Sequence, residues 1–591
     1  MKEIWSALGE DKALESHFAD IMIEVLKACS SREWRVRHAC CFCLSSLLDK
    51  RDFKQISDFI PELLRVSFYL LDDVNDLVQK CSLSLKSKIM SLITRFCDPK
   101  VSHDAQACID AMLPHFLDHG LAKSSAKAVQ EFSIAAILTI SKGGTSSLRP
   151  YLARLVEVLI DSMSQIEPME LSYAMHHTQA LNVTVEDMEN LRLMLINASP
   201  LSVALENCLG LVNEAVLPEV SAKVLELVRS SVGLGSMYGS VKCLKFLINS
   251  FPEFMSKYSN KTIPTLKPMI FDASPLVRKS FSSALAQVCK ISDPSFVASN
   301  LVLSLFESYY NDYEMDHRLK IASFMKELSR QASNSISACR DRVITFSFIH
   351  SFEEFDQKDN EWKFVFEESI PGGKSATFDQ LIHEFVQEIS ASLKCDVYSS
   401  KRASALAIQN LCQTLGKHPV LRGKFLVIMD ELLLVIVHGS SFKGKSDLFQ
   451  AIVALCRIAD RSCISQDYAG NVLKSIVIAM ARDGLVSEGV SAMSSVSSFF
   501  KSGSIALSLT KEFFVQMTLG SSSEDEESDG GSRLNQKRTQ VSLLNSLAKM
   551  WESCDTESQM DSGGWTADVV ESMVVGKSYE VRSAALSAMQ T

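Results

Sequence analysis

Apolar residues recur along most of the chain at the spacing of an α-helix. In the stretch 36–48 they stand at i, i+3, i+4, i+7, i+8, i+11 and i+12, which forms one stripe along a helix. This predicted stripe consists of Val36, Ala39, Cys40, Cys43, Leu44, Leu47 and Leu48. Further stripes follow over 56–64 and 74–92, whereas the alternation typical of strands is nearly absent. The pattern predicts an all-α protein.

Several of the predicted helices also resemble one another. Each has a Val or Ser and a charged or polar residue, followed by small residues that alternate with Leu or Ile. The segments are VRHACCFCLSSLL (36–48), VQKCSLSLKSKI (78–89), AVQEFSIAAILTI (128–140), LVRKSFSSALAQV (276–288), SKRASALAIQNL (400–411) and EVRSAALSAM (580–589). The first two are 42 positions apart (78 − 36). A period near 40 built from paired helices predicts a HEAT/armadillo-like superhelical solenoid of antiparallel helix pairs.

Two stretches interrupt the helical pattern. Residues 352–376 are charged and aromatic with a Pro-Gly-Gly turn, and we expect an insertion loop there. Residues 520–540 are rich in Ser, Gly and acidic residues, which predicts a disordered loop. The chain is thereby divided into solenoid segments 1–351 and 377–519 and terminal repeats over 541–591. Because the last predicted helix has no cap, we expect a segment of a longer array.

Composition narrows the class of protein. With 591 residues, 47% hydrophobic and 22% charged, the chain resembles an ordinary soluble folded protein. A formal charge of -10 without a Lys/Arg stripe argues against nucleic acid as the main partner. The sixteen cysteines follow no regular spacing, so a disulfide scaffold is disfavoured. The longest apolar run, 425–437, is interrupted by Asp430 and Glu431 and is too short for a bilayer. We expect a soluble intracellular protein without membrane insertion.

Three cysteines crowd into four positions and raise the question of a metal site. On the predicted helix, Cys40 and Cys43 lie on the apolar stripe and Cys41 lies off it. A structural zinc site needs four converging ligands, usually in two close pairs. The nearest other cysteines, Cys29 and Cys81, form no second pair. The sequence therefore predicts core residues and no metal site.

The sharpest enzymatic signal is a phosphate-loop match. Gly439, Gly444, Lys445 and Ser446 satisfy the spacing G-x-x-x-x-G-K-[ST], and the string FLVIMDE upstream resembles a Walker B strand. However, that string runs directly into the loop, which leaves no crossover helix between two parallel strands. The stretch 421–437 is also long enough to be a buried helix. We expect a turn between two solenoid helices, capped by Gly and Lys-Ser, and no cofactor. Nucleotide binding is the less favoured alternative.

Two weaker motifs have structural explanations. Gly233, Gly235 and Gly239 resemble a dinucleotide loop, but the third glycine is one position late and a helix precedes them. A tight turn between helices is the favoured interpretation. His176 and His177 have no carboxylate or cysteine at ligand spacing, so we expect an exposed or capping pair. The sequence predicts no catalytic residues.

A series of short motifs is similar, in its order, to the proteasome adaptor and scaffold family. The motifs are Trp34-Arg35-Val36-Arg37, Leu47-Leu48-x-x-Arg51, Asp72-Asp73-Val74, Cys97-Asp98-Pro99, Leu113-Pro114-x-x-Leu117-Asp118-x-Gly120, Ser199-Pro200, Arg229-Ser-x-Val232-Gly233-Leu234-Gly235, and Trp362 ahead of Pro371-Gly372. The resemblance is to the C-terminal half of these large HEAT-repeat proteins and covers nearly the whole chain. Gln79 departs from it, because the family usually has Arg at that position.

The resemblance implies a non-enzymatic adaptor of the 26S proteasome, found in cytoplasm and nucleus. Such a factor holds the core and regulatory particles together and acts in proteasome assembly and quality control. The family's N-terminal half is expected to be missing here, and the motifs define no contact residues. Inter-helix turns and the stretch 352–376 are candidate contacts. The alternatives are a generic HEAT scaffold or transport receptor for another cargo and, less favoured, a phosphate-loop NTPase.

Overall fold

The protein is built from helices. The computed structural model describes residues 17–124, 126–143, 146–165, 184–312, 314–355, 360–370, 374–460, 464–520, 530–552, 554, 564–571 and 579–588. Within these ranges every regular element is a helix, and none is long and apolar enough to cross a membrane. The predicted all-α fold is confirmed. The chain divides into unit 1, Met1–Ser292, and unit 2, Asp293–Thr591.

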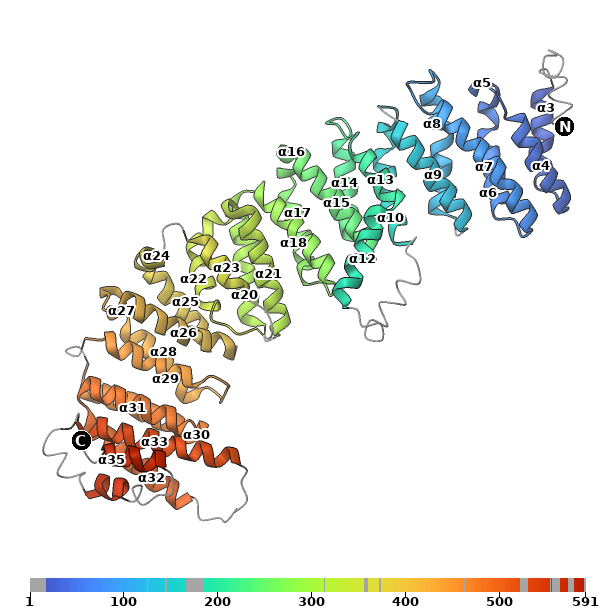
Figure 1. Ribbon diagram of the computed structural model, residues 1–591. Coiled ribbons are helices and arrows are strands. Elements are labelled where there is room, and N and C mark those ends of the chain that lie inside the picture. The colour runs from blue at the N-terminus through green and yellow to red at the C-terminus, as the bar shows by residue number, and fades with distance from the viewer. Residues whose placement is uncertain are drawn as a thin grey trace. The chain divides into compact units, whose positions relative to one another are not determined.

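Unit 1 consists of short helices that follow one another as antiparallel pairs (Figure 1). They are α3 (Phe18–Ala28), α4 (Trp34–Leu47), α5 (Phe53–Ile56), α6 (Ile60–Leu71), α7 (Asp76–Phe96), α8 (Ala105–His115), α9 (Lys127–Gly143), α10 (Leu152–Gln165), α12 (Val185–Ala198), α13 (Pro200–Leu209), α14 (Leu217–Ser230), α15 (Leu234–Ser250), α16 (Pro252–Ser256), α17 (Ser259–Leu266) and α18 (Pro275–Lys290).

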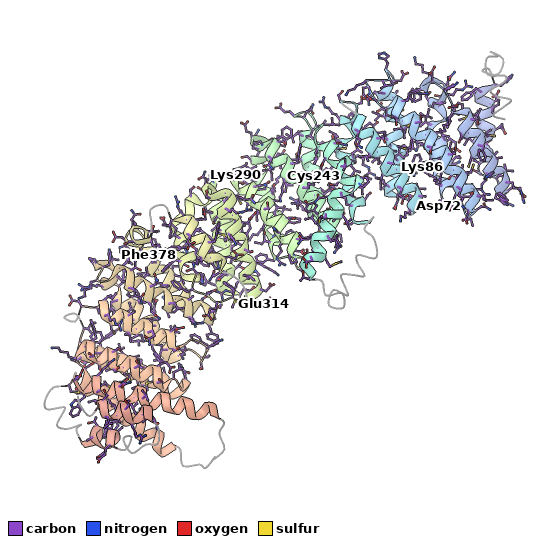
Figure 2. The ribbon with its side chains drawn as sticks, in the orientation of Figure 1. Asp72, Lys86, Cys243, Lys290, Glu314 and Phe378 are labelled. Atoms are coloured by element: carbon purple, nitrogen blue, oxygen red, sulfur yellow. The ribbon has the colours of Figure 1, made fainter. Side chains whose placement is uncertain are left out.

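The helices of unit 1 form two layers. The first helices of successive pairs contact one another: α6 contacts α8, and α10 contacts α14. The second helices do the same, with α4 against α7, α7 against α9, and α9 against α13 (Figure 1). Cys243 of α15 is fully buried among the helices, whereas Asp72, in the turn ahead of α7, lies at an edge (Figure 2). The turns inside the pairs are therefore the accessible parts of each repeat.

Unit 2 repeats this construction. Its helices are α19 (Pro294–Val297), α20 (Leu303–Asn311), α21 (Met315–Ala332), α22 (Arg340–His350), α23 (Glu361–Ser369), α24 (Lys374–Gln380), α25 (Ile382–Lys394), α26 (Tyr398–Leu415), α27 (Pro419–Gly423), α28 (Phe425–His438), α29 (Ser446–Ile458), α30 (Gln466–Asp483), α31 (Val486–Phe500), α32 (Gly503–Gly520), α33 (Gly530–Glu552) and α35 (Tyr579–Ala588). One layer runs α25, α28, α30 and α32, and the other runs α26, α29, α31 and α33.

The two predicted loops contain helix. Within 352–376 the chain forms α23 and the start of α24, and Trp362 is fully buried. The loop prediction is wrong here because Trp362, Val365 and Phe366 form a short buried face at helical spacing. Of the stretch 520–540, residues 521–529 lie outside the described ranges, and the described remainder belongs to α32 and α33.

The apolar stripe of α4 is rotated relative to the prediction. Cys41, expected off the stripe, is fully buried, whereas Val36 is 39% exposed and Ala39 is exposed. Cys43 is half-buried. Helical spacing identified the helix correctly, but it could not tell which sides of α4 a neighbouring helix would cover.

The turn that precedes a second helix recurs with the same hydrogen bonds. At its first position a Ser or Asp side chain accepts the backbone N–H two residues on. Six residues on, an Arg or Gln side chain donates to the first residue's own carbonyl, over 2.7 to 2.9 Å. The pairs are Ser31 with Arg37, Asp73 with Gln79, Ser124 with Gln130, and Asp272 with Arg278. We call this arrangement the repeat turn.

Candidate functional site

The phosphate-loop match is a variant of the repeat turn. Lys445 Nζ donates to the carbonyl of Gly439, six residues earlier, over 3.0 Å. Helix α28 ends just before Gly439, and α29 begins at Ser446, as expected for a turn between two helices. Gly444 has φ of 91°, a conformation that favours glycine. The motif's Gly and Lys therefore close a turn in the way that Asp73 and Gln79 close theirs.

Lys445 is also fixed by an ion pair from the next repeat. Its ammonium lies 2.6 Å from a carboxylate oxygen of Asp483, at the end of α30, and both side chains are almost fully buried. Burial lowers the pKa of Lys445, although Asp483 favours its charged form. A phosphate-loop lysine must reach the phosphates of a nucleotide. The Lys445 ammonium instead neutralises a buried carboxylate.

The Walker B-like residues lie on a helix, not on a strand. Asp430 and Glu431 belong to α28. Asp430 accepts a hydrogen bond from the Tyr468 hydroxyl at 2.6 Å, and Glu431 forms an ion pair with Lys394 at 2.8 Å. Both carboxylates therefore connect α28 to neighbouring helices of the same layer.

Three buried ion pairs share one arrangement, which we call a rung. In each, the cation at the last position of one turn reaches the acid at the start of the following turn. The rungs are Arg37 with Asp73 at 2.6 Å, Arg318 with Glu353 at 2.7 Å, and Lys445 with Asp483 at 2.6 Å. Gln79 keeps the carbonyl bond of the repeat turn but has no charge to form a rung. Rungs therefore fix the spacing of successive second helices.

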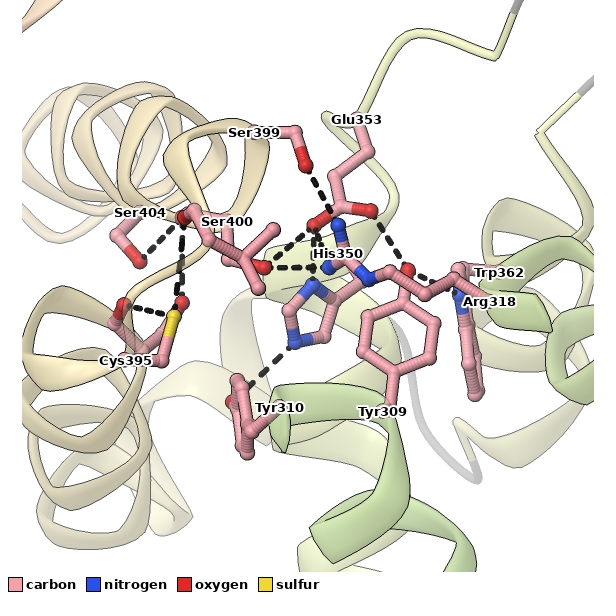
Figure 3. A network of polar contacts seen from close by, with 12 residues as sticks. Tyr309, Tyr310, Arg318, His350, Glu353, Trp362, Cys395, Ser399, Ser400 and Ser404 are labelled. Atoms are coloured by element: carbon pink, nitrogen blue, oxygen red, sulfur yellow. Dashed lines mark hydrogen bonds and ion pairs between the residues drawn. The ribbon is translucent and has the colours of Figure 1, made fainter. Parts of the chain in front are cut away.

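The Arg318–Glu353 rung is the centre of a larger polar network in unit 2 (Figure 3). Glu353 accepts hydrogen bonds from His350 Nδ1 at 2.8 Å and from the Tyr309 hydroxyl at 2.6 Å. Trp362 Nε1 donates in turn to the Tyr309 oxygen at 3.1 Å. The guanidinium also lies 4.0 Å from the centre of the Tyr309 ring. The network therefore joins α20, α21, α22 and α23.

Burial decides what this network can do chemically. Burial alone would raise the pKa of Glu353, but His350, Arg318 and Tyr309 together hold it at about 2. The His350 and Glu353 side chains form an acid–base pair of the kind found in enzymes, yet both are fully buried. The network therefore links helices in the interior of unit 2.

The stretch predicted as a contact loop divides into buried and exposed parts. Glu353 belongs to the network, whereas Glu354 is exposed and pairs with Arg402 at 2.8 Å. A hollow of about 390 Å³ lies in the same part of unit 2. Phenylalanines line it, and the charged side chains of Lys363, Glu367 and Lys374 stand at its rim. The exposed rim, rather than Glu353, is the part that a partner can touch.

The other sequence motifs serve packing. Gly233 has φ of 89° and precedes α15, whereas the next two glycines allow α15 to approach α10 closely. A Cβ at Gly235 would lie 2.7 Å from the Met163 carbonyl oxygen, and one at Gly239 would lie 2.7 Å from its sulfur. The histidines 176 and 177 lie outside the described residues.

The cysteine cluster packs between helices. Cys29, Cys40 and Cys41 are buried and Cys43 is half-buried. In the described part of the chain no group of three or more His, Cys, Asp or Glu side chains is placed to hold a metal ion. Burial raises the pKa of Cys41 to about 12, which disfavours the thiolate that metals and electrophiles require.

Comparison with known proteins supports the resemblance seen in the motifs. Residues 148–310 match the family model for the HEAT-repeat domain of proteasome adapter and scaffold protein ECM29. Over 576 residues the chain is 25% identical to the human proteasome adapter and scaffold protein ECM29, covering 93% of this chain and 30% of the human protein. The predicted family resemblance is confirmed.

The ECM29 likeness extends to other organisms. The proteasome component ECM29 of Saccharomyces cerevisiae is 21% identical over 77% of this chain and 24% of its own length. The ECM29 homolog of Drosophila melanogaster is 23% identical over 78% of the chain and 25% of its own length. The chain thus spans less than a third of the length of these relatives.

Solved structures resemble the chain only loosely. A crystal structure of importin beta aligns with 97% of this chain and 73% of its own at 13% identity, with a TM-score of 0.31. The Kap121p structure aligns with 99% and 68% of the two chains at 10% identity, with a TM-score of 0.30. Similarity at this level supports no argument about function.

Proposed function

We propose that this chain is a non-enzymatic HEAT-repeat adaptor that binds the 26S proteasome and helps to hold its core and regulatory particles together. The supporting observation is the similarity to human ECM29 over 93% of the chain, because that relative is a proteasome adapter and scaffold protein. We further propose that it acts in proteasome assembly and quality control, in cytoplasm and nucleus.

The architecture suits such a role. In a repeat protein each repeat contacts mainly its neighbours, so binding energy spreads over an extended surface. The rungs fix neighbouring turns to one another, which keeps accessible side chains at constant spacing. The residues that a nucleotide would need, Lys445 above all, are occupied in holding helices. This argues for a binding scaffold over a phosphate-loop NTPase.

Co-sedimentation tests the proposal. The tagged chain is mixed with purified 26S proteasomes and separated on a glycerol gradient. We expect the chain in the proteasome fractions, and we expect excess importin-type cargo peptides not to displace it. A folded chain that stays at the top of the gradient would contradict the adaptor proposal and favour a scaffold for another cargo.

A surface variant then locates the contact. Lys374 lies at the rim of the phenylalanine hollow, at the first position of α24, where a Glu is well tolerated. We expect Lys374→Glu to weaken co-sedimentation several-fold. The matched control is Lys474→Glu, an equal charge change on the exposed side of α30. An equal loss of co-sedimentation in both variants would show that binding depends on the net charge of the chain and not on the rim of the hollow.

A further inference from the structure

Two buried thiols face each other where one helix pair of unit 1 joins the next. Cys97 is the residue at which α7 ends, and Cys108 lies near the start of α8. Their sulfur atoms are 3.3 Å apart, and the two side chains are 2% and 0% exposed. The Cys108 sulfur also lies 3.8 Å from the Met112 sulfur. The two thiols are therefore in direct contact, although they are 11 positions apart in the chain.

The separation of the two sulfurs is close to what a disulfide requires. A disulfide bond is about 2.05 Å long, so the sulfurs need to approach each other by about 1.2 Å. Rotation of either side chain about its Cα–Cβ bond moves the sulfur in this way. Formation of the bond therefore needs a shift that is shorter than a carbon–carbon bond.

The turn between α7 and α8 gives access to the pair. Residues 98–104 form this turn and none of them is buried; Val101 is 66% exposed. Asp104, the residue before α8, makes no side-chain capping hydrogen bond to the first turn of the helix. Helix ends without such a cap open locally more readily than helix interiors. Local opening at the start of α8 therefore brings a small oxidant, such as hydrogen peroxide, to the thiols.

The two thiols have different roles in such an oxidation. The hydrogen bond with Cys97, together with burial, raises the pKa of Cys108. This disfavours the Cys108 thiolate, which is the form that attacks peroxide. We therefore expect peroxide to react at Cys97. Cys108 is held in contact with the product, and this proximity offsets its low reactivity.

We propose that Cys97 and Cys108 form a site of reversible oxidation by peroxide, at which a disulfide fastens the start of α8 to the end of α7. The Cys97 sulfur attacks one oxygen of hydrogen peroxide, the O–O bond breaks, and a sulfenic acid and water form. The Cys108 sulfur then attacks the Cys97 sulfur: the S–S bond forms, the S–O bond breaks, and a second water leaves with the Cys108 proton. The two thiols lose two electrons in total, and these reduce the peroxide to water.

The disulfide would act on a joint of the repeat array. Residues 98–104 connect the pair that ends with α7 to the pair that begins with α8. Because each repeat contacts mainly its neighbours, such a connection is where successive pairs can shift against each other. Oxidation would thus stiffen one joint of unit 1. The inference does not depend on the proposed function.

Peptide mapping of the whole chain tests this proposal. The native protein is treated with hydrogen peroxide, the remaining thiols are blocked with N-ethylmaleimide, and the digest is analysed by mass spectrometry without reduction. We expect a Cys97–Cys108 cross-linked peptide that disappears on treatment with dithiothreitol. Cys108→Ala should lack this peptide and keep Cys97 as a sulfenic acid, which dimedone labels. The matched control, Cys289→Ala, changes another buried cysteine and should form the cross-link as the native chain does.

Hydrogen exchange measures the mechanical effect without any variant. Amide exchange over residues 98–108 should be several-fold slower in the peroxide-treated chain than in the reduced chain, because the bond opposes local opening. Equal exchange in a chain that carries the cross-link would overturn the fastening of α8. Free Cys97 and Cys108 in a chain whose half-buried Cys43 is already oxidised would overturn the oxidation site itself. A cross-link from Cys97 to a different cysteine would do the same.

Discussion

Two rungs of the same kind differ in how deeply they are buried. The Arg37–Asp73 pair of unit 1 is a two-bond pair, at 2.6 and 2.9 Å, and the Arg37 side chain is 11% exposed. In unit 2, Arg318 and Glu353 are 1% and 0% exposed. Besides the two guanidinium bonds, the Asp73 carboxylate accepts one backbone N–H, that of Asn75, and needs no further side chain. The second pair needs His350 and further donors, because a buried carboxylate must have all its hydrogen bonds satisfied.

The comparison also explains why more side chains contact the Glu353 carboxylate than the Asp73 carboxylate. Arg37 holds the pKa of Asp73 below its ordinary value, by a hydrogen bond that outweighs burial. For Glu353 burial acts most strongly and in the opposite direction, and several partners together overcome it. The repeat turn therefore sets where a charge pair can form, while local burial sets how many partners it requires.

Removing the cation of the buried rung should have the largest effect. Arg318→Ala leaves Glu353 in the interior without its arginine counter-charge, which costs about 3–5 kcal/mol. We expect a lower urea midpoint for unit 2, measured by circular dichroism and by proteolysis between 293 and 400. A loss below about 1 kcal/mol would mean that the remaining donors satisfy Glu353 by themselves.

Lys445→Ala should lower the free energy of unfolding by about 3 kcal/mol, somewhat less than Arg318→Ala. The variant leaves the buried Asp483 carboxylate with Arg482 as its remaining ion-pair partner. The double variant Lys445→Met, Asp483→Leu should recover most of the loss, since no charge then remains buried. Denaturant unfolding measures both. ATP binding that is present in the native chain and absent in Lys445→Ala would contradict the structural role of this lysine.

Acid should weaken unit 2 through Glu353. Because its pKa is lowered from 4.5 to about 2, its ionised form stabilises the fold fully above pH 4.5. That contribution is lost as the pH falls from 4.5 towards 2. Unfolding free energy measured across this window should fall more steeply in the native chain than in Glu353→Gln. Identical slopes would show that folding does not lower the pKa of Glu353.

The smallest effect on stability is expected for the Arg37–Asp73 rung of unit 1. Arg37→Gln copies Gln79, so it keeps the bond to the Ser31 carbonyl but loses the charge pair with Asp73. We expect a cost of about 1–2 kcal/mol, read from the urea midpoint of unit 1. Arg37→Leu removes both bonds and should cost more. If the two variants are equally stable, the carbonyl bond of the repeat turn contributes nothing.

Helical periodicity predicted much of the fold. The 42-residue offset of Val36 and Val78 identified equivalent helices, and α4 and α7 are equivalent in the structure. The turn at Gly439 was also expected from the apolar run ahead of it. The helix over 361–369 was missed, because its charged residues and its large apolar residues are equal in number and the charged ones suggested a loop.

The polar network could not be predicted from the sequence. Glu353 follows Tyr309 by 44 positions and Arg318 by 35, and nothing in this spacing shows that the three side chains meet. The repeat turn would have been a usable signal, since Asp312 and Arg318 are six residues apart as Asp73 and Gln79 are. It becomes visible only once the hydrogen bonds of several turns are compared.

The sequence alone identified the repeated helices with clear apolar stripes, because 3.6-residue periodicity is a property of local order along the chain. It also determined the family resemblance, which depends on the order of short motifs. Only the tertiary structure decided which side of α4 is interior, and that Lys445 neutralises Asp483 instead of facing a nucleotide. The physical reason is the same in both cases: burial and charge pairing depend on neighbours from other repeats, and local spacing carries no information about them.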